Sequence, residues 1–345
     1  MKNIKSYKAA ILVAQKKKLK ILKISNLQDL SPGQVEVKII SAAICGAQIG
    51  EIDGIKGPDK WLPHCLGHEG YGKVINKHNG IKNFKIGDEV ILHWRKSSGI
   101  NAKSAKYNSK IGIINAGQVT TLQKYAIVSE NRLSKIKKFK NYYKIAPMLG
   151  CALPTSWGIL NKETKFNNKN KYLIIGAGGI GLTVAALAKI QNAKDIVLVE
   201  KFKKNKILEN LNLKSINLKS FFKLKDKYFN ITIDTTGNAN NISKAFDLTS
   251  KNGVLVLVGQ PKKNTILKLN DPIRLFNAPN DNIKIISSDG GQFNPKKDLT
   301  KLVRIVKKNY TYLKKLITDE IKLDNINEYI SKIKSGKSAR VIIKL

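Results

Sequence analysis

The sequence predicts an α/β fold combined with an all-β unit: a barrel-like β domain followed by a doubly wound parallel sheet. Two features of the 345-residue chain carry this prediction. Short strands separated by turns fill the first part of the chain, as in the period-two run at 35–40 that follows the turn at 31–33. Further along, short apolar strands alternate with helices, which is typical of a parallel sheet covered on both faces.

Each half of this prediction rests on several segments. In the β-rich half, strands are expected at 9–14, 35–40, 70–75 and 88–92. In the second half, strands are expected at 172–175, 196–199, 231–234 and 254–258, with helices at 179–190, 206–211 and 242–248. A helix at 326–333 and a strand at 340–344 end the chain. We therefore expect a barrel domain over 1–152, a doubly wound domain over 153–291, and a C-terminal segment over 292–345 that returns to the barrel.

A glycine-rich turn connects the first strand and helix of the second half. Its sequence fits G-x-G-x-x-G, it follows an apolar strand and it opens a helix, and this context is what the dinucleotide-binding fingerprint requires. The first glycine permits a tight turn, the second lets the backbone approach a pyrophosphate, and the third allows close helix–strand packing. The helix N-terminus adds N–H groups that favour a phosphate. The candidate cofactor residues in this turn are Gly176, Gly178, Gly179, Ile180 and Gly181.

The next strand ends in an acid, Glu200, which indicates the type of dinucleotide. A carboxylate here would accept hydrogen bonds from the ribose hydroxyls and repel a 2′-phosphate, so NAD is favoured over NADP. The lysine-rich run at 201–206 could partly accommodate a phosphate. The alternative is a glycine-rich turn that binds no ligand.

The net charge of +39 is the most unusual bulk property of the chain. It would ordinarily suggest a polyanionic partner such as nucleic acid. The excess is nearly all lysine, however, and it is spread over the whole sequence among abundant Asn and Ile, as an AT-rich coding sequence would produce. We therefore expect no nucleic-acid partner, because base and phosphate recognition favour arginine. A lysine-rich surface could still steer an anionic substrate.

Localisation and redox state follow from smaller features. No apolar run approaches the ~20 residues that span a bilayer, and the run at 9–14 is too short for the core of a signal peptide. We expect a cytoplasmic protein without a membrane partner. The three cysteines, Cys45, Cys65 and Cys151, are too few for a disulfide framework, so they are free thiols or metal ligands.

Two of these cysteines combine with a histidine into a possible metal site. Cys45, His68 and Cys151 are a soft-to-borderline donor set, and three protein ligands with one open position are how catalytic zinc is held. The residues are too far apart in sequence for a structural zinc finger, so only a folded barrel with Cys151 at its exit could bring them together. We expect Cys65 to be a buried, small apolar residue instead.

Two segments carry a resemblance to a known family. Residues 67–74, GHEGYGKV, resemble the G-H-E-x-x-G-x-V signature of zinc-containing medium-chain alcohol dehydrogenases. Residues 149–158, LGCALPTSWG, resemble the segment with the third zinc ligand in alcohol and glutathione-dependent formaldehyde dehydrogenases. The similarity extends through the glycine turn to 335–340. It implies a GroES-like catalytic barrel, a Rossmann domain with ligands in the cleft between them, and a homodimer.

The resemblance also implies residue roles. Cys45, His68 and Cys151 would bind one catalytic zinc, with Glu69 behind the metal as an outer or exchanging ligand. The implied cofactor contacts are Thr155 beside the nicotinamide, Ile180 behind its ring, and Arg340 at the pyrophosphate. Val258 ends a strand of the second domain and should border the same cleft. Trp94, with His93 beside it, would line the substrate pocket. The implied reaction is hydride transfer between NAD(H) and an alcohol/aldehyde or ketone pair.

The chain also departs from the family pattern. After Cys45, where the family usually has a hydroxyl residue, an acid and often a histidine, this chain has Ala47, Gln48 and Gly50. The usual proton path is therefore missing, and His64, His93 or a direct water route would have to replace it. The four-cysteine lobe for a structural zinc is absent from 95–114, which predicts a single zinc. Arg95, in this stretch, could bind an anionic group of the substrate or be an ordinary loop charge.

Two other functions remain open from the sequence alone. The first is a zinc-free NAD(P)H reductase of the same superfamily, which the missing proton path would allow and the three retained ligand types argue against. The second is a non-catalytic basic protein that binds an acidic partner, for which the unclustered lysines give little support.

Overall fold

The first part of the chain forms a barrel and an adjoining sheet. The computed structural model describes residues 6–137, 139–203, 205–225 and 228–345. A closed barrel has the strand order β1 (Tyr7–Leu12), β2 (Lys20–Asn26), β7 (Lys106–Ser109), β8 (Gly112–Asn115) and β4 (His64–Cys65). The adjoining sheet has the order β10 (Leu133–Lys135), β6 (Glu89–His93), β5 (Glu69–Lys77), β3 (Gln34–Ala43), β18 (Val341–Lys344) and β17 (Asp319–Lys322). In addition, β9 (Tyr125–Ser129) pairs with β3.

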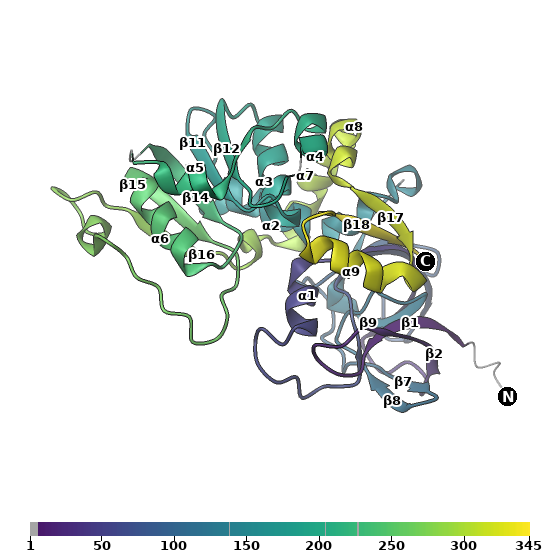
Figure 1. The fold of residues 1–345 in the computed structure, drawn as a ribbon. Helices are drawn as coiled ribbons and strands as arrows, with labels where there is room; N and C mark the ends of the chain where they lie inside the picture. Colours follow the sequence, from purple (N-terminus) through teal and green to yellow (C-terminus); the bar gives the residue numbers. More distant parts are fainter. Residues whose placement is uncertain (1–5, 138, 204, 226–227) are drawn as a thin grey trace.

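The second part of the chain forms a parallel sheet on the other side of the molecule (Figure 1). Its order is β13 (Ser215–Ile216), β12 (Asp195–Val199), β11 (Lys171–Ile175), β14 (Phe229–Asp234), β15 (Thr249–Leu257) and β16 (Lys284–Ser287). In sequence order this is 3-2-1-4-5-6, the Rossmann arrangement, and every neighbouring pair is parallel. The predicted fold class, a β-barrel domain with a doubly wound sheet, is confirmed.

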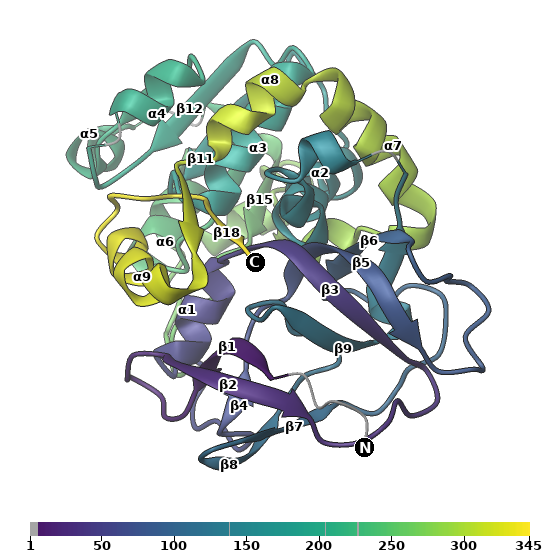
Figure 2. The ribbon, with the colours of Figure 1, turned by 90° about the vertical axis from the view of Figure 1, so that its right-hand side faces the viewer.

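Helices cover the parallel sheet and join the two parts. They are α2 (Ala152–Gly158), α3 (Gly179–Ile190), α4 (Asn205–Asn210), α5 (Leu218–Lys223) and α6 (Ala239–Leu248). The short α1 (Gly46–Ile52) belongs to the barrel side (Figure 2). The helix α3 has the predicted bounds, and it is rich in buried Ala and Leu because it packs tightly on β11 and β12.

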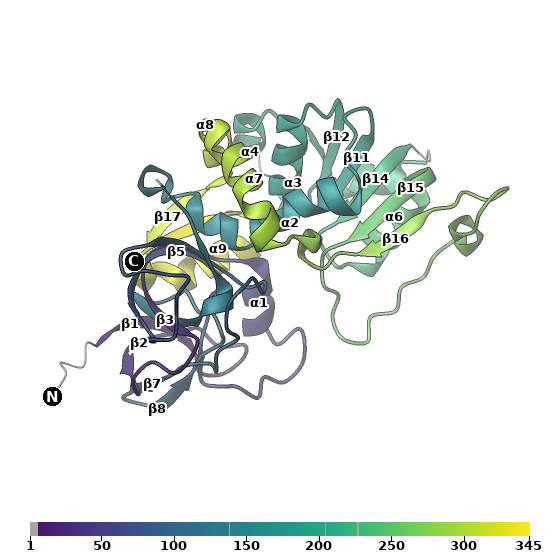
Figure 3. The ribbon, with the colours of Figure 1, turned by 180° about the vertical axis from the view of Figure 1, so that it is seen from behind.

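The C-terminal segment divides between the two parts. The helices α7 (Pro295–Lys308) and α8 (Tyr310–Leu313) pack beside α2 and α3 in one core, with Leu302 and Val306 fully buried. In contrast, β18 pairs with β3, and α9 (Ile326–Lys334) packs on the barrel core (Figures 2 and 3). The sequence predicts that the segment 292–345 returns to the barrel. In the structure α9 and β18 lie on the barrel, whereas α7 and α8, which the sequence did not reveal as helices, pack on the parallel-sheet side.

The sharp beginning of α7 has a local cause. Asn294 is the N-cap, and its side chain accepts a hydrogen bond from the Lys297 N–H at 3.2 Å. Pro295 occupies the first helical position, where its missing N–H costs nothing. Among the residues that the structure describes, no helix is both long and apolar enough to span a lipid bilayer.

Candidate functional site

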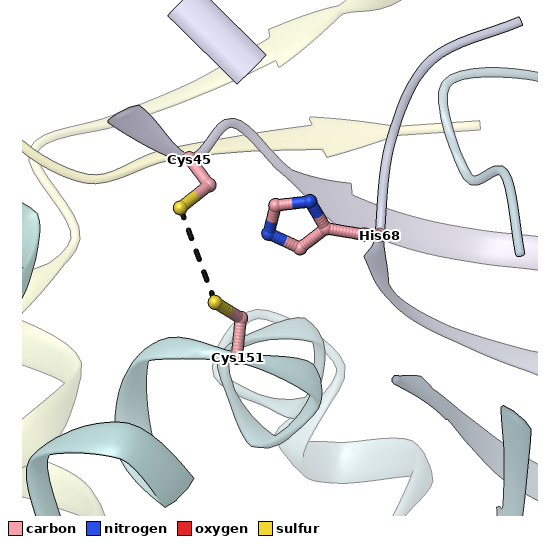
Figure 4. A group of neighbouring side chains, drawn as sticks. All are labelled: Cys45, His68 and Cys151. Atoms are coloured by element: carbon pink, nitrogen blue, oxygen red, sulfur yellow. Dashed lines mark hydrogen bonds between the residues drawn. The ribbon is translucent and has the colours of Figure 1, made fainter. Parts of the chain in front are cut away.

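Three distant segments meet at a cluster of thiols and imidazole. Cys45 lies between β3 and α1, His68 lies in the turn before β5, and Cys151 is the N-cap of α2. One ligand atom from each residue lies within 4.8 Å of the others. The two sulfur atoms are 3.9 Å apart, and the edge of the imidazole ring is directed toward them (Figure 4). The structure thus brings together the three residues predicted to bind zinc.

Two glycines explain why these side chains can meet. Gly67 has φ +102°, and a Cβ there would lie 2.3 Å from the Thr121 hydroxyl oxygen, so only glycine fits before His68. A Cβ at Gly150 would lie 2.3 Å from the Leu92 carbonyl oxygen and 2.8 Å from Cα of Glu69. The turn that carries Cys151 can therefore approach β5 and β6 only because residue 150 has no side chain.

The donor set fits a zinc ion. The Cys45 and Cys151 side chains are buried, and Nε2 of His68 is buried without a hydrogen-bond partner among the described residues. Tetrahedral zinc with Zn–S bonds of about 2.3 Å would hold two thiolates about 3.8 Å apart. The hydrogen bond from the Cys151 thiol lowers the pKa of Cys45 well below its usual value, and the same bond raises the pKa of Cys151. Cys45 is therefore the more readily deprotonated of the two thiols, as a zinc ligand must be.

A buried ion pair links this cluster to the glycine turn. Glu69 is fully buried, and its Oε1 accepts a hydrogen bond from Nη1 of Arg340 at 2.9 Å, while its Oε2 has no partner among the described residues. Burial raises the pKa of the Glu69 carboxyl, although Arg340 opposes the shift. A Cβ at Gly179 would lie 2.8 Å from the Arg340 guanidinium. Arg340 therefore touches both candidate sites.

The glycine turn lies between β11 and α3, at the point where the strand order reverses. A Cβ at Gly181 would lie 1.9 Å from the Gly176 carbonyl oxygen, so this helix turn packs against its own strand end. A Cβ at Gly178 would meet no atom within 4 Å, so this side of the turn is open. In doubly wound sheets, ligands bind at this position, outside the carboxyl ends of the strands.

Glu200 lies directly after β12, close to the glycine turn. Its Oε2 accepts a hydrogen bond from the Ala177 N–H at 3.0 Å, and its Oε1 accepts from the Lys201 and Phe202 N–H groups. The carboxylate is therefore held next to the turn. In the lysine-rich run 201–206, which could accommodate a phosphate, Lys204 lies outside the described residues.

The remaining predicted cofactor contacts also lie around this turn. Thr155 is buried on α2, one helical turn after Cys151, and its N–H donates to the Cys151 carbonyl at 3.0 Å. Ile180 is in the first turn of α3, where its carbonyl accepts a hydrogen bond from the Ser156 hydroxyl at 3.5 Å. Val258 follows β15, and its N–H donates to the Asp234 carbonyl at 2.8 Å. Ile180 thus belongs to the glycine turn itself, Thr155 lies on the helix that is hydrogen-bonded to this turn, and Val258 follows a strand of the same parallel sheet.

His93 has no free ring nitrogen. Its Nδ1 lies 2.7 Å from the Arg95 carbonyl oxygen, and its Nε2 lies 2.9 Å from the Ser134 hydroxyl. Burial lowers the pKa of His93 to about 4, so the ring is neutral near pH 7. It borders a small hollow with Trp94 and Leu149, but its hydrogen bonds leave no nitrogen to take up a proton.

Trp94 and Arg95 contact the loop after β16. A Cβ at Gly290 would lie 2.5 Å from the Trp94 ring, and the Arg95 guanidinium lies 5.0 Å from the centre of that ring. Nη2 of Arg95 is 3.3 Å from the Asp289 carboxylate. Arg95, considered above for an anionic substrate group, is thus paired with Asp289.

A second polar cluster surrounds His64. Its Nε2 lies 2.8 Å from Oδ2 of Asp59 and 3.7 Å from Oε1 of Glu51. His64 was a candidate proton acceptor from the sequence, but neither carboxylate was singled out. Asp59 and Glu51 precede His64 by 5 and 13 residues, and this spacing matches no common motif. Glu51, His64 and His68 all line a cavity of about 330 Å³ on the barrel side. This cavity therefore connects the second cluster to the first.

Comparisons with known proteins agree with this arrangement. Residues 31–138 match the family model described as alcohol dehydrogenase GroES-like domain, and residues 179–308 match the one described as zinc-binding dehydrogenase. The chain is 26% identical to alcohol dehydrogenase 6 of Peromyscus maniculatus, with 90% of each chain covered.

Two solved structures show the same fold. Benzyl alcohol dehydrogenase from Acinetobacter calcoaceticus superposes with a TM-score of 0.85 at 20% identity, covering 99% of this chain and 100% of that one. A zinc-binding dehydrogenase from Sinorhizobium meliloti 1021, bound to NADP, superposes with a TM-score of 0.78 at 16% identity, with 99% and 100% covered.

Proposed function

Because the chain belongs to the zinc-containing medium-chain alcohol dehydrogenase family and is an oxidoreductase of that type, we propose that it transfers hydride between NAD(H) and an alcohol/carbonyl pair with the help of one zinc. The zinc would be held by Cys45, His68 and Cys151. The observation that carries the proposal is the convergence of two buried thiols and the half-buried imidazole of His68, with their ligand atoms within 4.8 Å of one another. The substrate would be an alcohol, an aldehyde or a ketone.

The chain's own residues supply binding and positioning for this reaction. Bound zinc would supply Lewis acidity at the alcohol oxygen, and bound nicotinamide would accept or donate the hydride. Cys45 and Cys151 would hold the zinc as thiolates, because only the deprotonated sulfur is a zinc ligand. Arg340 contacts Gly179 and can place its charge at the pyrophosphate, while Glu69 holds Arg340 from the other side. Thr155 extends this contact region along α2.

The proposal favours NAD over NADP. Glu200 is held at the end of β12, where its carboxylate would repel a 2′-phosphate. The competing observation is a neighbouring cavity of about 320 Å³ lined by Lys203, Lys206, Lys315 and Lys337, together with the NADP bound in the Sinorhizobium meliloti relative. Titration of protein fluorescence with NADH and NADPH decides between them. We expect NADH to bind more tightly, and Glu200→Ala to reduce that preference.

Metal analysis of the purified chain tests the zinc-dependent function. We expect Cys45→Ser and Cys151→Ser each to lose one zinc per chain relative to wild type and to lose alcohol oxidation, while NADH still binds. Cys65→Ser is the matched control, because Cys65 is buried away from the cluster and should keep the zinc. If wild type and Cys45→Ser hold the same amount of zinc, the proposal is wrong, and a zinc-free reductase of the same family takes its place.

A further inference from the structure

We propose that Glu51, Asp59 and His64 form a second divalent-cation site, separate from the cysteine cluster. The candidate ligand atoms, His64 Nε2, Asp59 Oδ2 and Glu51 Oε1, all lie within 4.8 Å of one another. They come from α1, from the connection after it, and from β4. The proposal does not depend on the function proposed above, because it shares no ligand with the cysteine cluster.

The orientation of the His64 ring is that of a metal ligand. Its Nδ1 lies 2.9 Å from the Cys65 carbonyl oxygen, which can only accept, so Nδ1 carries a hydrogen. The other ring nitrogen, Nε2, is hydrogen-bonded to the Asp59 carboxylate at 2.8 Å, and a cation bound here would take the place of the hydrogen on Nε2. A backbone carbonyl that holds one imidazole nitrogen while the other binds the metal is a common arrangement at metal sites. His64 and the two carboxylates therefore converge at a point where a cation, replacing the hydrogen on Nε2, could bind all three.

The cavity beside these ligands offers a second, independent indication. Gln48 and Thr120 line it together with Glu51 and His64, and each is only 2% exposed. Nε2 of Gln48 and Oγ1 of Thr120 have no hydrogen-bond partner within the described part of the chain. Buried polar atoms without partners are rare in folded proteins. A cation with two or three water ligands in this cavity would give these atoms their missing partners.

The donor atoms indicate the class of cation. One imidazole and two carboxylates suit Mn²⁺, Fe²⁺ or Zn²⁺, whereas the two thiolates of the cysteine cluster favour zinc over Mn²⁺. Asp59 and His64 are about nine-tenths buried and Glu51 is 42% exposed, so a cation can enter from the Glu51 side. Mn²⁺ is therefore a probe that binds the second site and leaves the first one alone.

A cation here would hold the connection between α1 and β4 in place. In its central part, that connection is tied to the barrel by Gln15, which donates to the Gly57 carbonyl at 3.0 Å and accepts from the Asp59 N–H at 3.3 Å. It also carries Ile55, which lines a cavity with Thr236 and Gln260 at the carboxyl ends of β14 and β15. The second site would thus stabilise the loop that faces the dinucleotide-binding edge of the parallel sheet.

Titration of chelator-treated full-length protein with Mn²⁺, followed by the electron paramagnetic resonance signal of free Mn²⁺, tests this site. We expect one Mn²⁺ per chain in wild type, and binding weakened by about tenfold or more in His64→Gln, Asp59→Asn and Glu51→Gln. Glu51→Gln is the variant that tests the site without disturbing a buried residue. Mn²⁺ should also raise the melting temperature of wild type but not of these variants.

Two controls bear on the specificity of that result. Asp53→Asn removes a half-buried acid that pairs with Lys334, and this variant should bind Mn²⁺ as wild type does. Cys45→Ser should also keep the Mn²⁺ site, which separates it from the cysteine cluster. The proposal is overturned if wild type shows no saturable Mn²⁺ binding, or if His64→Gln and Glu51→Gln bind Mn²⁺ as tightly as wild type.

Discussion

The two halves of the candidate active site are built in different ways. The glycine turn is one continuous segment, and its shape depends on backbone contacts between residues five apart, such as Gly176 and Gly181. The cysteine cluster takes its three members from segments that lie 23 to 106 residues apart in the sequence. Only the pairing of β3 with β5, and the approach of the turn at Gly150, bring them together. The turn is thus a local structure, whereas the cluster is a product of tertiary packing.

This difference indicates where substitutions act. A change in the turn should affect dinucleotide binding through the backbone and leave the barrel intact. A change in the packing around the cluster should release the metal even where no ligand is altered. The Glu69–Arg340 ion pair is the exception, because it connects the two halves.

The largest effect is expected from Glu69→Gln. This change leaves the guanidinium of Arg340, which is only 2% exposed, without its charged partner. Loss of one member of a buried ion pair lowers the free energy of unfolding by about 3–5 kcal/mol. Denaturant unfolding measures this cost, and NADH titration should show weaker binding because Arg340 also touches Gly179. An unfolding free energy within about 1 kcal/mol of wild type would contradict a structural role for the pair.

Gly150→Ala should break the cluster without touching a ligand. The new methyl group would lie 2.3 Å from the Leu92 carbonyl oxygen, so the turn before Cys151 must move away from β6. Overpacking of this kind costs about 1–3 kcal/mol. We expect zinc content to fall while NADH binding remains. Gly117→Ala, where the nearest atom would be 3.3 Å away, is the control. Retention of the full zinc content in Gly150→Ala would show that the turn tolerates displacement.

Two alanine substitutions in the glycine turn should separate folding from ligand binding. Gly181→Ala places a Cβ 1.9 Å from the Gly176 carbonyl oxygen and should lower the melting temperature as well as NADH affinity. Gly178→Ala meets no atom within 4 Å, so the fold should be unchanged. Its NADH affinity should fall about tenfold, since the methyl group occupies the space that a pyrophosphate needs. Unchanged NADH affinity in Gly178→Ala would place the dinucleotide elsewhere.

The same distinction between local and distant structure explains what the sequence could predict. The strand, glycine turn and helix at 172–190 follow from neighbouring residues, and α3 has the predicted bounds. Cys45, His68 and Cys151 were grouped because their donor types and the family resemblance pointed to one metal, and the fold brings them together. His64 could be singled out as a histidine near the motif, but its partners Asp59 and Glu51 depend on how the loop after α1 folds back. The hydrogen bond between His93 and Ser134 also comes from a strand pairing, between β6 and β10, that no motif marks.

The smallest effect is expected from the exposed counterpart of the Glu69–Arg340 pair. Lys8 and Asp324 also tie the C-terminal segment to the barrel, with Nζ 2.8 Å from Oδ1, but both side chains are more than half exposed. Solvent screens such a pair, and exposed ion pairs contribute about 0–1 kcal/mol. Asp324→Asn should therefore change the unfolding free energy by less than about 1 kcal/mol, and less still at high salt. If Asp324→Asn lowers the unfolding free energy as much as Glu69→Gln does, surface charges hold the C-terminal segment to the barrel. The buried Arg340 would then not be what connects the two halves of the site.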